Sequence, residues 1–313
     1  MASTTAFLYR DEYLKHETGF GHPERPARLL AIQEALDSSG LRSQLTPVEP
    51  RNATLEEIAA VHQERYIERV RAIAQGGGGH LDYDTVISPQ SFEIALLAAG
   101  AVLSGIDAVL SGKVDNAFAC VRPPGHHATP DRGMGFCLFN NVAIGARYAQ
   151  RAHGIERVLI VDWDVHHGNG TQDTFYTDPS VFYFSIHQHP LYPGTGMESE
   201  RGAGAGEGTT LNVPVPPGST DEDYYRAFEE KLLPAARRFR PDLILISAGF
   251  DAHESDPLAS IYLTAEAFGR LTAYVRELAE ECCGGRIVSA LEGGYSLHGL
   301  STSVVEHLKG LLA

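Results

Sequence analysis

Cysteine is scarce in this 313-residue chain, which has only four, and none of them forms a CxxC pair. Neither a disulfide framework nor a cysteine zinc site is therefore indicated. The first residues, MASTTAFLYRDEY, lack a basic stretch followed by an apolar one, so they do not indicate a secretory signal. We expect an intracellular, cytoplasmic protein. The cysteines are Cys120, Cys137, Cys282 and Cys283.

Long apolar runs and positive charge are also in short supply. We find no apolar run close to the ~20 residues that span a bilayer, and so predict no membrane segment. The 25 Lys and Arg residues are outnumbered by 40 Asp and Glu residues, which gives a net charge of −15. Such a surface repels nucleic acid and attracts cations. The simpler explanation of this negative charge is solubility, and the more specific one is a cationic substrate.

The apolar residues that are present form strand-like runs that alternate with helical periods, without an internal repeat or a long linker. This alternation favours a mostly parallel sheet covered by helices on both faces. We therefore predict an α/β fold with one domain over residues 1–313. The predicted strands are 5–9, 116–121, 157–163, 181–186, 209–215, 242–248 and 286–291.

Helix starts and stops support the same organisation. Pro26 opens a helix that Gly40 ends. The segment SPQSFEIALLAAGAVLSGIDAVL is apolar nearly all round and predicts a helix packed on several sides. The other predicted features are a capping box at Thr54 and Glu57, caps at Thr220 (for a helix to about Phe239) and Thr264, and loops at 76–79 and 201–210.

Four of the predicted strands end in clusters of polar side chains. Ligands of open α/β sheets bind at the carboxyl ends of strands, so we expect the four clusters to form one site. Burying charged groups is costly unless they are paired or bind a metal. The strand ends are AFACVRPPGHHA with His126 and His127, VLIVDWDVHHGNGT with Asp162, Asp164 and His166, DLILISAGFDAH with Asp251 and His253, and RIVSALEGGY with Glu292 and Tyr295.

Three of these side chains fit a metal. Asp164 and His166 are two residues apart, so they can point the same way from an extended segment. Together with Asp251 they would form a three-ligand set with open positions, which is how a catalytic zinc site is built.

The remaining strand-end groups fit the rest of an amide hydrolase. The pair His126 and His127 can supply a general base and an electrostatic partner or acid. The hydroxyl of Tyr295, on a Gly293–Gly294 turn, can donate to a developing oxyanion.

The same stretches resemble the histone deacetylase family, which has the arginase/deacetylase fold. The motifs are RPPGHHA, GMGFCLFNN, DWDVHHGNGTQ, PGTG, GFDAHESDPL and LEGGY in the family order, with GHPERPARL and VHQERYIERV near the start. LEGGY and HPERPARL are more similar to the class II branch and its bacterial amidohydrolase relatives. The resemblance implies an eight-stranded sheet and zinc-dependent removal of acetyl or another acyl group from N-acyl-lysine.

The resemblance also implies a role for each matching residue. Zinc would be bound by Asp164, His166 and Asp251, with His126 and His127 as the tandem histidines, Asp162 orienting one of them, and Tyr295 as the oxyanion donor. A structural K⁺ or Na⁺ would be held by Asp162, Asp164, His166, Ser185 and Ile186, and a second one by Phe175, Asp178 and Val181. The acyl-lysine channel and its mouth would use Phe136, Tyr192, Gly135, Leu258 and Asp84.

At several positions a purely structural role competes with a functional one. A single aromatic is by default a core residue, but the positions of Phe136 and Tyr192 next to the site motifs favour a channel. His167 alternates away from His166, so we treat it as structural. Glu292 is expected to be a solvated or hydrogen-bonded carboxylate, and Cys137 a packing residue near the pocket.

Other functions remain open. An acetylpolyamine amidohydrolase would suit the negative charge, although Leu258 stands where a polyamine-preferring relative carries its acidic gatekeeper. An arginase-like di-manganese hydrolase would need further bridging ligands. A non-catalytic module that binds acyl-lysine would be indicated by loss of Tyr295, a zinc ligand or the tandem histidines, and none is missing. The sequence does not fix the oligomeric state.

Overall fold

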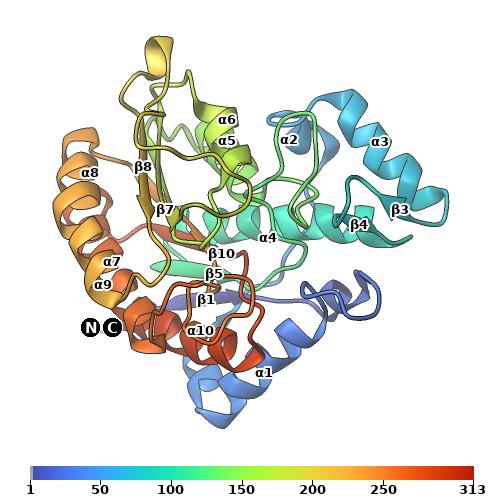
Figure 1. Ribbon diagram of the computed structural model, residues 1–313, viewed down its shortest axis with the longest axis horizontal. Helices are drawn as coiled ribbons and strands as arrows, with labels where there is room; N and C mark the ends of the chain where they lie inside the picture. The colour runs from blue at the N-terminus through green and yellow to red at the C-terminus, as the bar shows by residue number, and fades with distance from the viewer. Residues whose placement is uncertain (1–2) are drawn as a thin grey trace.

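An eight-stranded sheet runs through the centre of the computed structural model, which describes residues 3–313 (Figure 1). Its order is β2-β1-β5-β10-β9-β6-β7-β8, and every neighbouring pair is parallel. The strands are β1 (Thr5–Leu8), β2 (Thr46–Pro47), β5 (Asn116–Ala119), β6 (Val158–Asp162), β7 (Val181–Gln188), β8 (Thr210–Val215), β9 (Leu243–Ala248) and β10 (Ile287–Leu291).

All seven predicted strands are present, with ends that differ by at most two residues. The eighth, β2, was not predicted because two residues show no periodicity. A separate hairpin of β3 (Gly79–His80) and β4 (Val86–Ile87) was also missed. It takes Gly79 out of the predicted 76–79 loop.

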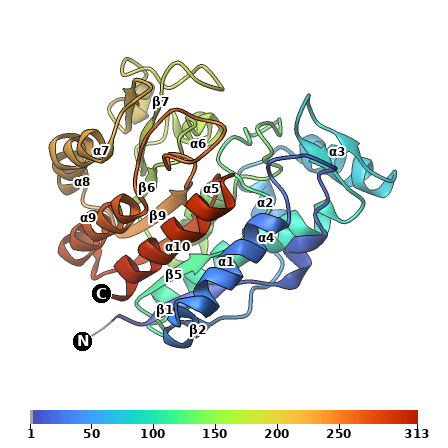
Figure 2. The same ribbon diagram turned by 60° about the horizontal axis from the view of Figure 1, so that its bottom comes forward.

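Helices cover both faces of the sheet, and the described start of the chain lies beside its end, where the Ser3 amide donates to the Leu312 carbonyl at 3.1 Å (Figures 1 and 2). α4 and α5 pack on one face, whereas α1, α9 and α10 pack together on the other. The helices are α1 (Ala27–Ser38), α2 (Leu55–Ala59), α3 (Glu64–Gln75), α4 (Ser91–Leu110), α5 (Asn141–His153), α6 (Asn169–Phe175), α7 (Asp221–Ala227), α8 (Leu233–Phe239), α9 (Ala265–Cys283) and α10 (Leu297–Leu312). The prediction of one α/β domain is confirmed.

The predicted caps are present. Thr54 and Glu57 form a reciprocal capping box at the start of α2, and Thr264 accepts the amide of Ala267 at the start of α9. Thr220 caps α7, but the helix predicted to run on to Phe239 is interrupted by a π-helical turn, Phe228–Leu232, before α8.

The prediction that no run is long enough for a membrane span was wrong for α4. This helix has 20 residues and is apolar enough to cross a bilayer by length and composition. Of the apolar window, 83% is buried inside the fold, where α4 packs against β5, β10 and α5. The few polar side chains in α4 do not lower its mean hydropathy, 1.8 over the apolar window, enough to exclude a span by composition.

A buried ion cluster fixes the segment before α1. Glu24 is fully buried and pairs with the guanidinium groups of Arg122 and of Arg28, the latter at 3.1 Å. Burial opposes the ionised form of Glu24, but Arg122 and Arg28 lower its pKa to about 2. The cluster therefore ties the start of α1 to the segment that follows β5.

Glu24→Gln is expected to lower the free energy of unfolding by about 3–5 kcal/mol, because it leaves buried guanidinium charge without its carboxylate. The folded-state pKa of Glu24 lies below the ordinary value of 4.5, so its stabilisation is present above pH 4.5 and is lost as the pH falls toward about 2. Denaturant unfolding at several pH values measures both effects. Glu49→Gln, which removes an exposed partner of Arg10, is the control and should cost less than about 1 kcal/mol. Equal losses in the two variants would contradict the interpretation.

Candidate active site

The four polar strand ends do meet. β5, β10, β9 and β6 are consecutive in the sheet, and since all four are parallel, their carboxyl ends lie along one edge. These four strands are the central ones of the eight-stranded sheet, so the site lies over the middle of the sheet and not beside its outer strands. This explains why its charged groups are buried.

Asp164, His166 and Asp251 form a compact cluster. One ligand atom from each lies within 4.8 Å of the others, and all three residues are buried. Nδ1 of His166 is 3.2 Å from Oδ1 of Asp164 and 3.1 Å from Oδ2 of Asp251. Backbone amides orient the carboxylates, since Val165 donates to Asp251 at 2.9 Å and Gly293 donates to Asp164 at 2.8 Å.

The charges of this cluster fit a cation. Burial and the facing carboxylate of Asp164 raise the pKa of Asp251 to about 7. Among residues 3–313, only histidines lie within ion-pair distance of the two carboxylates, and no Lys or Arg does. Two carboxylates and an imidazole are the donor types that zinc takes in proteins. The residues present therefore fit one zinc ion with positions left open.

A second group of possible ligands, His126, Cys137 and Glu292, satisfies the same distance criterion. Its atoms are already used. Oε2 of Glu292 accepts the amide of Gly125 at 2.6 Å, and the thiol of Cys137 donates to the carbonyl of Gly135. Burial raises the pKa of the Cys137 thiol well above its usual value, which disfavours the thiolate that a metal needs. We assign no metal to this group.

The tandem histidines have different partners. Nδ1 of His126 lies 3.1 Å from Oδ2 of Asp162, whereas Nδ1 of His127 lies 2.9 Å from Oδ1 of Asn169. Tyr183 also donates to Asp162, at 2.9 Å. Of the two histidines that Asp162 was predicted to orient, it contacts His126.

The centroids of the two imidazoles are only 4.0 Å apart, yet the pKa values of the two histidines are shifted in opposite directions. Burial opposes the charged form of His126, but Asp164 and Asp162 raise its pKa well above the usual value. Burial and the neighbouring His126 lower the pKa of His127 well below it. The hydrogen bond to Asn169 places the proton of neutral His127 on Nδ1 and leaves Nε2 with its lone pair.

Aromatic rings flank the cluster. The Phe136 ring packs edge-on against Tyr295, with centroids 5.7 Å apart, and Tyr192 packs against His127 at 5.2 Å and His166 at 6.4 Å. Neither aromatic is a core residue, since Phe136 is half-buried and Tyr192 is 41% exposed. Gly135 lies against His127 and Tyr192, where a side chain would collide with the imidazole.

Of the predicted mouth residues, Asp84 lies near these rings, and Leu258 is connected through Asp256 to the backbone of Tyr295. Nε2 of His22 contacts the carbonyl of Asp84 at 3.0 Å, and the His22 ring packs against Phe136 at 4.8 Å. Leu258 is half-buried, and its amide donates to Asp256 at 3.0 Å. Asp84 therefore belongs to the same rim as the Phe136 wall.

The first predicted monovalent-cation site adjoins the cluster of Asp164, His166 and Asp251, and the second lies between α6 and β7. At the first, Asp162 at the end of β6 is paired in register with Ser185 within β7. At the second, Phe175, Asp178 and Val181 lie on the turn from α6 to β7, where Arg147 pairs with the Asp178 carboxylate at 2.6 Å.

Several neighbours in the site were missed or misjudged from sequence. Asn169 could have been found, because it follows the ligands directly in HHGNG. Arg28 and Asp256 contact the Tyr295 loop from segments far away in sequence. Glu292 is fully buried and accepts hydrogen bonds from Gly125, His126 and Ser247, so the hydrogen-bonded alternative is the one that the structure confirms. Nδ1 of His167 lies 2.8 Å from the Thr195 hydroxyl, and its Nε2 lies 3.1 Å from Oε1 of Gln172. These contacts agree with the predicted structural role.

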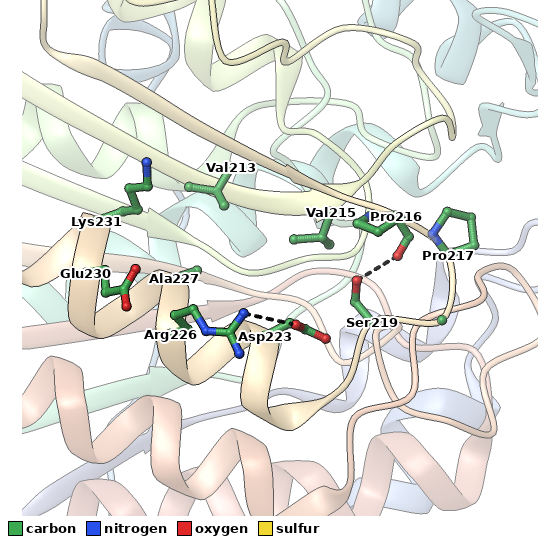
Figure 3. Close-up of a pocket in the computed structure, with 11 residues that line it drawn as sticks. Val213, Val215, Pro216, Pro217, Ser219, Asp223, Arg226, Ala227, Glu230 and Lys231 are labelled. Carbon is green, nitrogen blue, oxygen red and sulfur yellow. Dashed lines mark hydrogen bonds and ion pairs between the residues drawn. The ribbon is translucent and has the colours of Figure 1, made fainter.

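The cavity drawn in Figure 3 is a different place in the molecule. It lies between β8 and the helical segment of α7 and the π-helical turn, and none of its lining residues belongs to the predicted site. Its charged groups include Arg226 and Asp223, which pair with each other at 3.7 Å. We therefore assign this cavity no role in the chemistry of the site.

The fold and the site together define a deacetylase-like hydrolase scaffold, and comparison with known proteins places the chain in a family. The histone deacetylase domain model matches residues 22–311. The chain belongs to the histone deacetylase family.

Named relatives agree with this assignment. The chain is 45% identical to a probable deacetylase of Archaeoglobus fulgidus, over 94% of this chain and 82% of that protein. It is 43% identical to a histone deacetylase-like amidohydrolase of Pseudomonas aeruginosa, over 99% and 87%. The crystal structure of the HDA15 HD domain superposes with a TM-score of 0.94 at 42% identity, covering 99% of this chain and 88% of that one. This confirms the arginase/deacetylase fold.

Asp251→Asn is expected to abolish tight zinc binding, because it removes one anionic ligand of the cluster. Metal content after dialysis measures this, with the wild type expected to retain one zinc per chain. Asp173→Asn, a charge change on α6 away from the cluster, should retain it as well. Full zinc content in Asp251→Asn would place the metal elsewhere.

Proposed function

We propose that the protein is a zinc-dependent amidohydrolase that removes acetyl or another acyl group from N-acyl-lysine side chains. The observation that carries the proposal is the buried cluster of Asp164, His166 and Asp251 beside two histidines with different hydrogen-bond partners, a carboxylate for His126 and an amide oxygen for His127. Membership of the histone deacetylase family supports it. The overall reaction adds water to the amide and releases a carboxylate and an amine.

When bound at the cluster, zinc supplies Lewis-acid chemistry at the amide carbonyl. The protein's own groups supply the proton transfers. His127 holds a free lone pair on Nε2 and is the group that takes a proton from the attacking water and returns it to the departing amine. His126, held as the cation by Asp162, stabilises the negative charge of the tetrahedral intermediate.

Tyr295 completes the site as the donor to the oxyanion. Burial and the charge of Asp251 raise the pKa of its hydroxyl well above the usual value, so the phenol keeps its proton. A protonated phenol can donate a hydrogen bond to the oxygen that becomes negative.

The aromatic walls favour a long, neutral aliphatic stem. Phe136 and Tyr192 lie on the Tyr295 side and the histidine side of the cluster, and their ring faces need no charge on the substrate. Acylation removes the lysine ammonium charge, so an acylated side chain suits this channel better than a free one. Asp84 at the rim would accept hydrogen bonds from the substrate backbone.

Tyr295→Phe should keep zinc and lower kcat by about 10²–10³-fold, the usual effect of deleting one oxyanion donor. Turnover of an acetyl-lysine peptide and metal content are measured on the same samples. Tyr83→Phe, a change at a fully exposed tyrosine, is the matched control. An undiminished kcat in Tyr295→Phe would remove the tyrosine from the mechanism.

Acetylpolyamine hydrolysis is a second candidate. The net charge of −15 and the acidic pair Asp82 and Asp84 beside the rim favour a cationic substrate. Leu258 at the predicted gatekeeper position disfavours it.

Side-by-side kcat/KM values on an acetyl-lysine peptide and an acetylated polyamine separate the two candidates, and we expect the peptide to be preferred. A clear preference for the polyamine would make the acidic rim functional. Asp82→Asn should then reduce polyamine turnover more than peptide turnover.

A further inference from the structure

The segment that carries Tyr295 is held by charged side chains from other parts of the chain. We call residues 292–296 the tyrosine loop. Arg28 donates to the carbonyls of Glu292 and Gly294, both at 2.6 Å, and its guanidinium lies 5.0 Å from the Tyr295 ring centroid. These contacts fix the carbonyls of the loop, but they leave its last two amides to other partners.

Asp256 accepts those amides. Its Oδ2 lies 2.6 Å from the nitrogen of Tyr295 and 3.1 Å from the nitrogen of Ser296. Its Oδ1 accepts the amide of Leu258 at 3.0 Å. Asp256 is only 7% exposed, so these charge-assisted hydrogen bonds are shielded from water.

The backbone beside Tyr295 makes this anchor matter. Gly294 has a φ of 122°, a conformation that residues with a side chain rarely adopt. The glycine gives the chain freedom immediately before Tyr295, and the hydrogen bond to Asp256 removes it immediately after. Ser296 is also the N-cap of the 16-residue helix α10, whose N-terminal end favours a nearby negative charge.

We propose that Asp256 is a positioning residue that fixes Tyr295 for the reaction and links it to Leu258 at the rim. This inference rests on the proposed function for its kinetic consequence, although the positioning itself does not. Asp256→Asn keeps the shape of the side chain but replaces one accepting oxygen with an NH₂ donor. Either the tyrosine loop or Leu258 then loses its acceptor.

The first test is a double-mutant cycle on zinc-loaded protein. Asp256→Asn should lower kcat by about 10–100-fold, because a displacement of about 1 Å in a catalytic group can cost about 10²-fold. KM should change by less than about 3-fold, since substrate binding is not the affected step. In a Tyr295→Phe background, Asp256→Asn should change kcat by less than about 2-fold, since the hydroxyl that it positions is already gone.

Asp221→Asn is the matched control. Asp221 also holds a backbone amide at a helix start, that of Thr264 before α9, at 2.9 Å, but it does not contact the tyrosine loop. It should leave kcat unchanged. Full kcat in Asp256→Asn, or an equal loss in the wild-type and Tyr295→Phe backgrounds, would overturn the proposal.

A second measurement does not need turnover. With 3-fluorotyrosine incorporated and the position-295 resonance assigned by its loss in Tyr295→Phe, ¹⁹F NMR reports on the ring directly. Asp256→Asn should shift or broaden this resonance, and Asp221→Asn should not. If Asp256→Asn fails to fold, Asp256→Glu, which keeps the charge but moves it, is measured in its place.

Different results would contradict the positioning role of Asp256 and the proposed hydrolase function. An unmoved resonance in a folded Asp256 variant overturns the positioning role. A wild-type protein that hydrolyses no acyl amide, while the resonance still responds to Asp256, overturns the proposed function and supports the positioning role.

Discussion

Two buried carboxylates that face each other, Asp164 and Asp251, impose the main constraint on this structure. Their repulsion is not relieved by any Lys or Arg among residues 3–313, and burial strengthens it. The parallel sheet brings them together because β6 and β9 are neighbours and both carry acidic residues beyond their carboxyl ends. Backbone amides and His166 orient the pair, and a cation bound between the two carboxylates would balance their charge. The fold therefore creates the electrostatic demand that the metal is proposed to meet.

The surrounding charges follow from that demand. Asp164 and Asp162, which lie on either side of His126, raise its pKa, whereas burial and the neighbouring His126 lower the pKa of His127. Arg28 belongs both to the Glu24 cluster and to the tyrosine loop, so the segment before α1 is connected to Tyr295 through one guanidinium. Asp256 holds the same loop through the backbone amides of Tyr295 and Ser296. The acid, the base and the oxyanion donor of the proposed reaction thus depend on a network of buried ionic groups.

Much of this could be predicted from the sequence, and the remainder has physical reasons. The buried strands are continuous apolar runs, so their positions were found, and the polar clusters at their ends indicated the site. β2 was missed because a two-residue strand depends on its pairing with β1 alone. α4 has the composition of a membrane span, but its apolar residues all round predicted a helix packed on several sides, and its burial in the fold confirms that prediction. Arg28 and Asp256 are charged residues that sequence patterns place in solvent, and only the tertiary path brings them to the tyrosine loop. Which histidine pairs with Asp162 depends on ring orientation, which adjacent residues in a sequence do not reveal.

We expect one metal ion between Asp164, His166 and Asp251. Anomalous X-ray diffraction from crystals of the zinc-loaded protein, recorded on both sides of the zinc edge, would locate it. One strong zinc peak should lie at about 2.0–2.2 Å from a ligand atom of each residue. Two adjacent peaks, as in a dinuclear hydrolase, or a peak at His126, Cys137 and Glu292 instead, would contradict it.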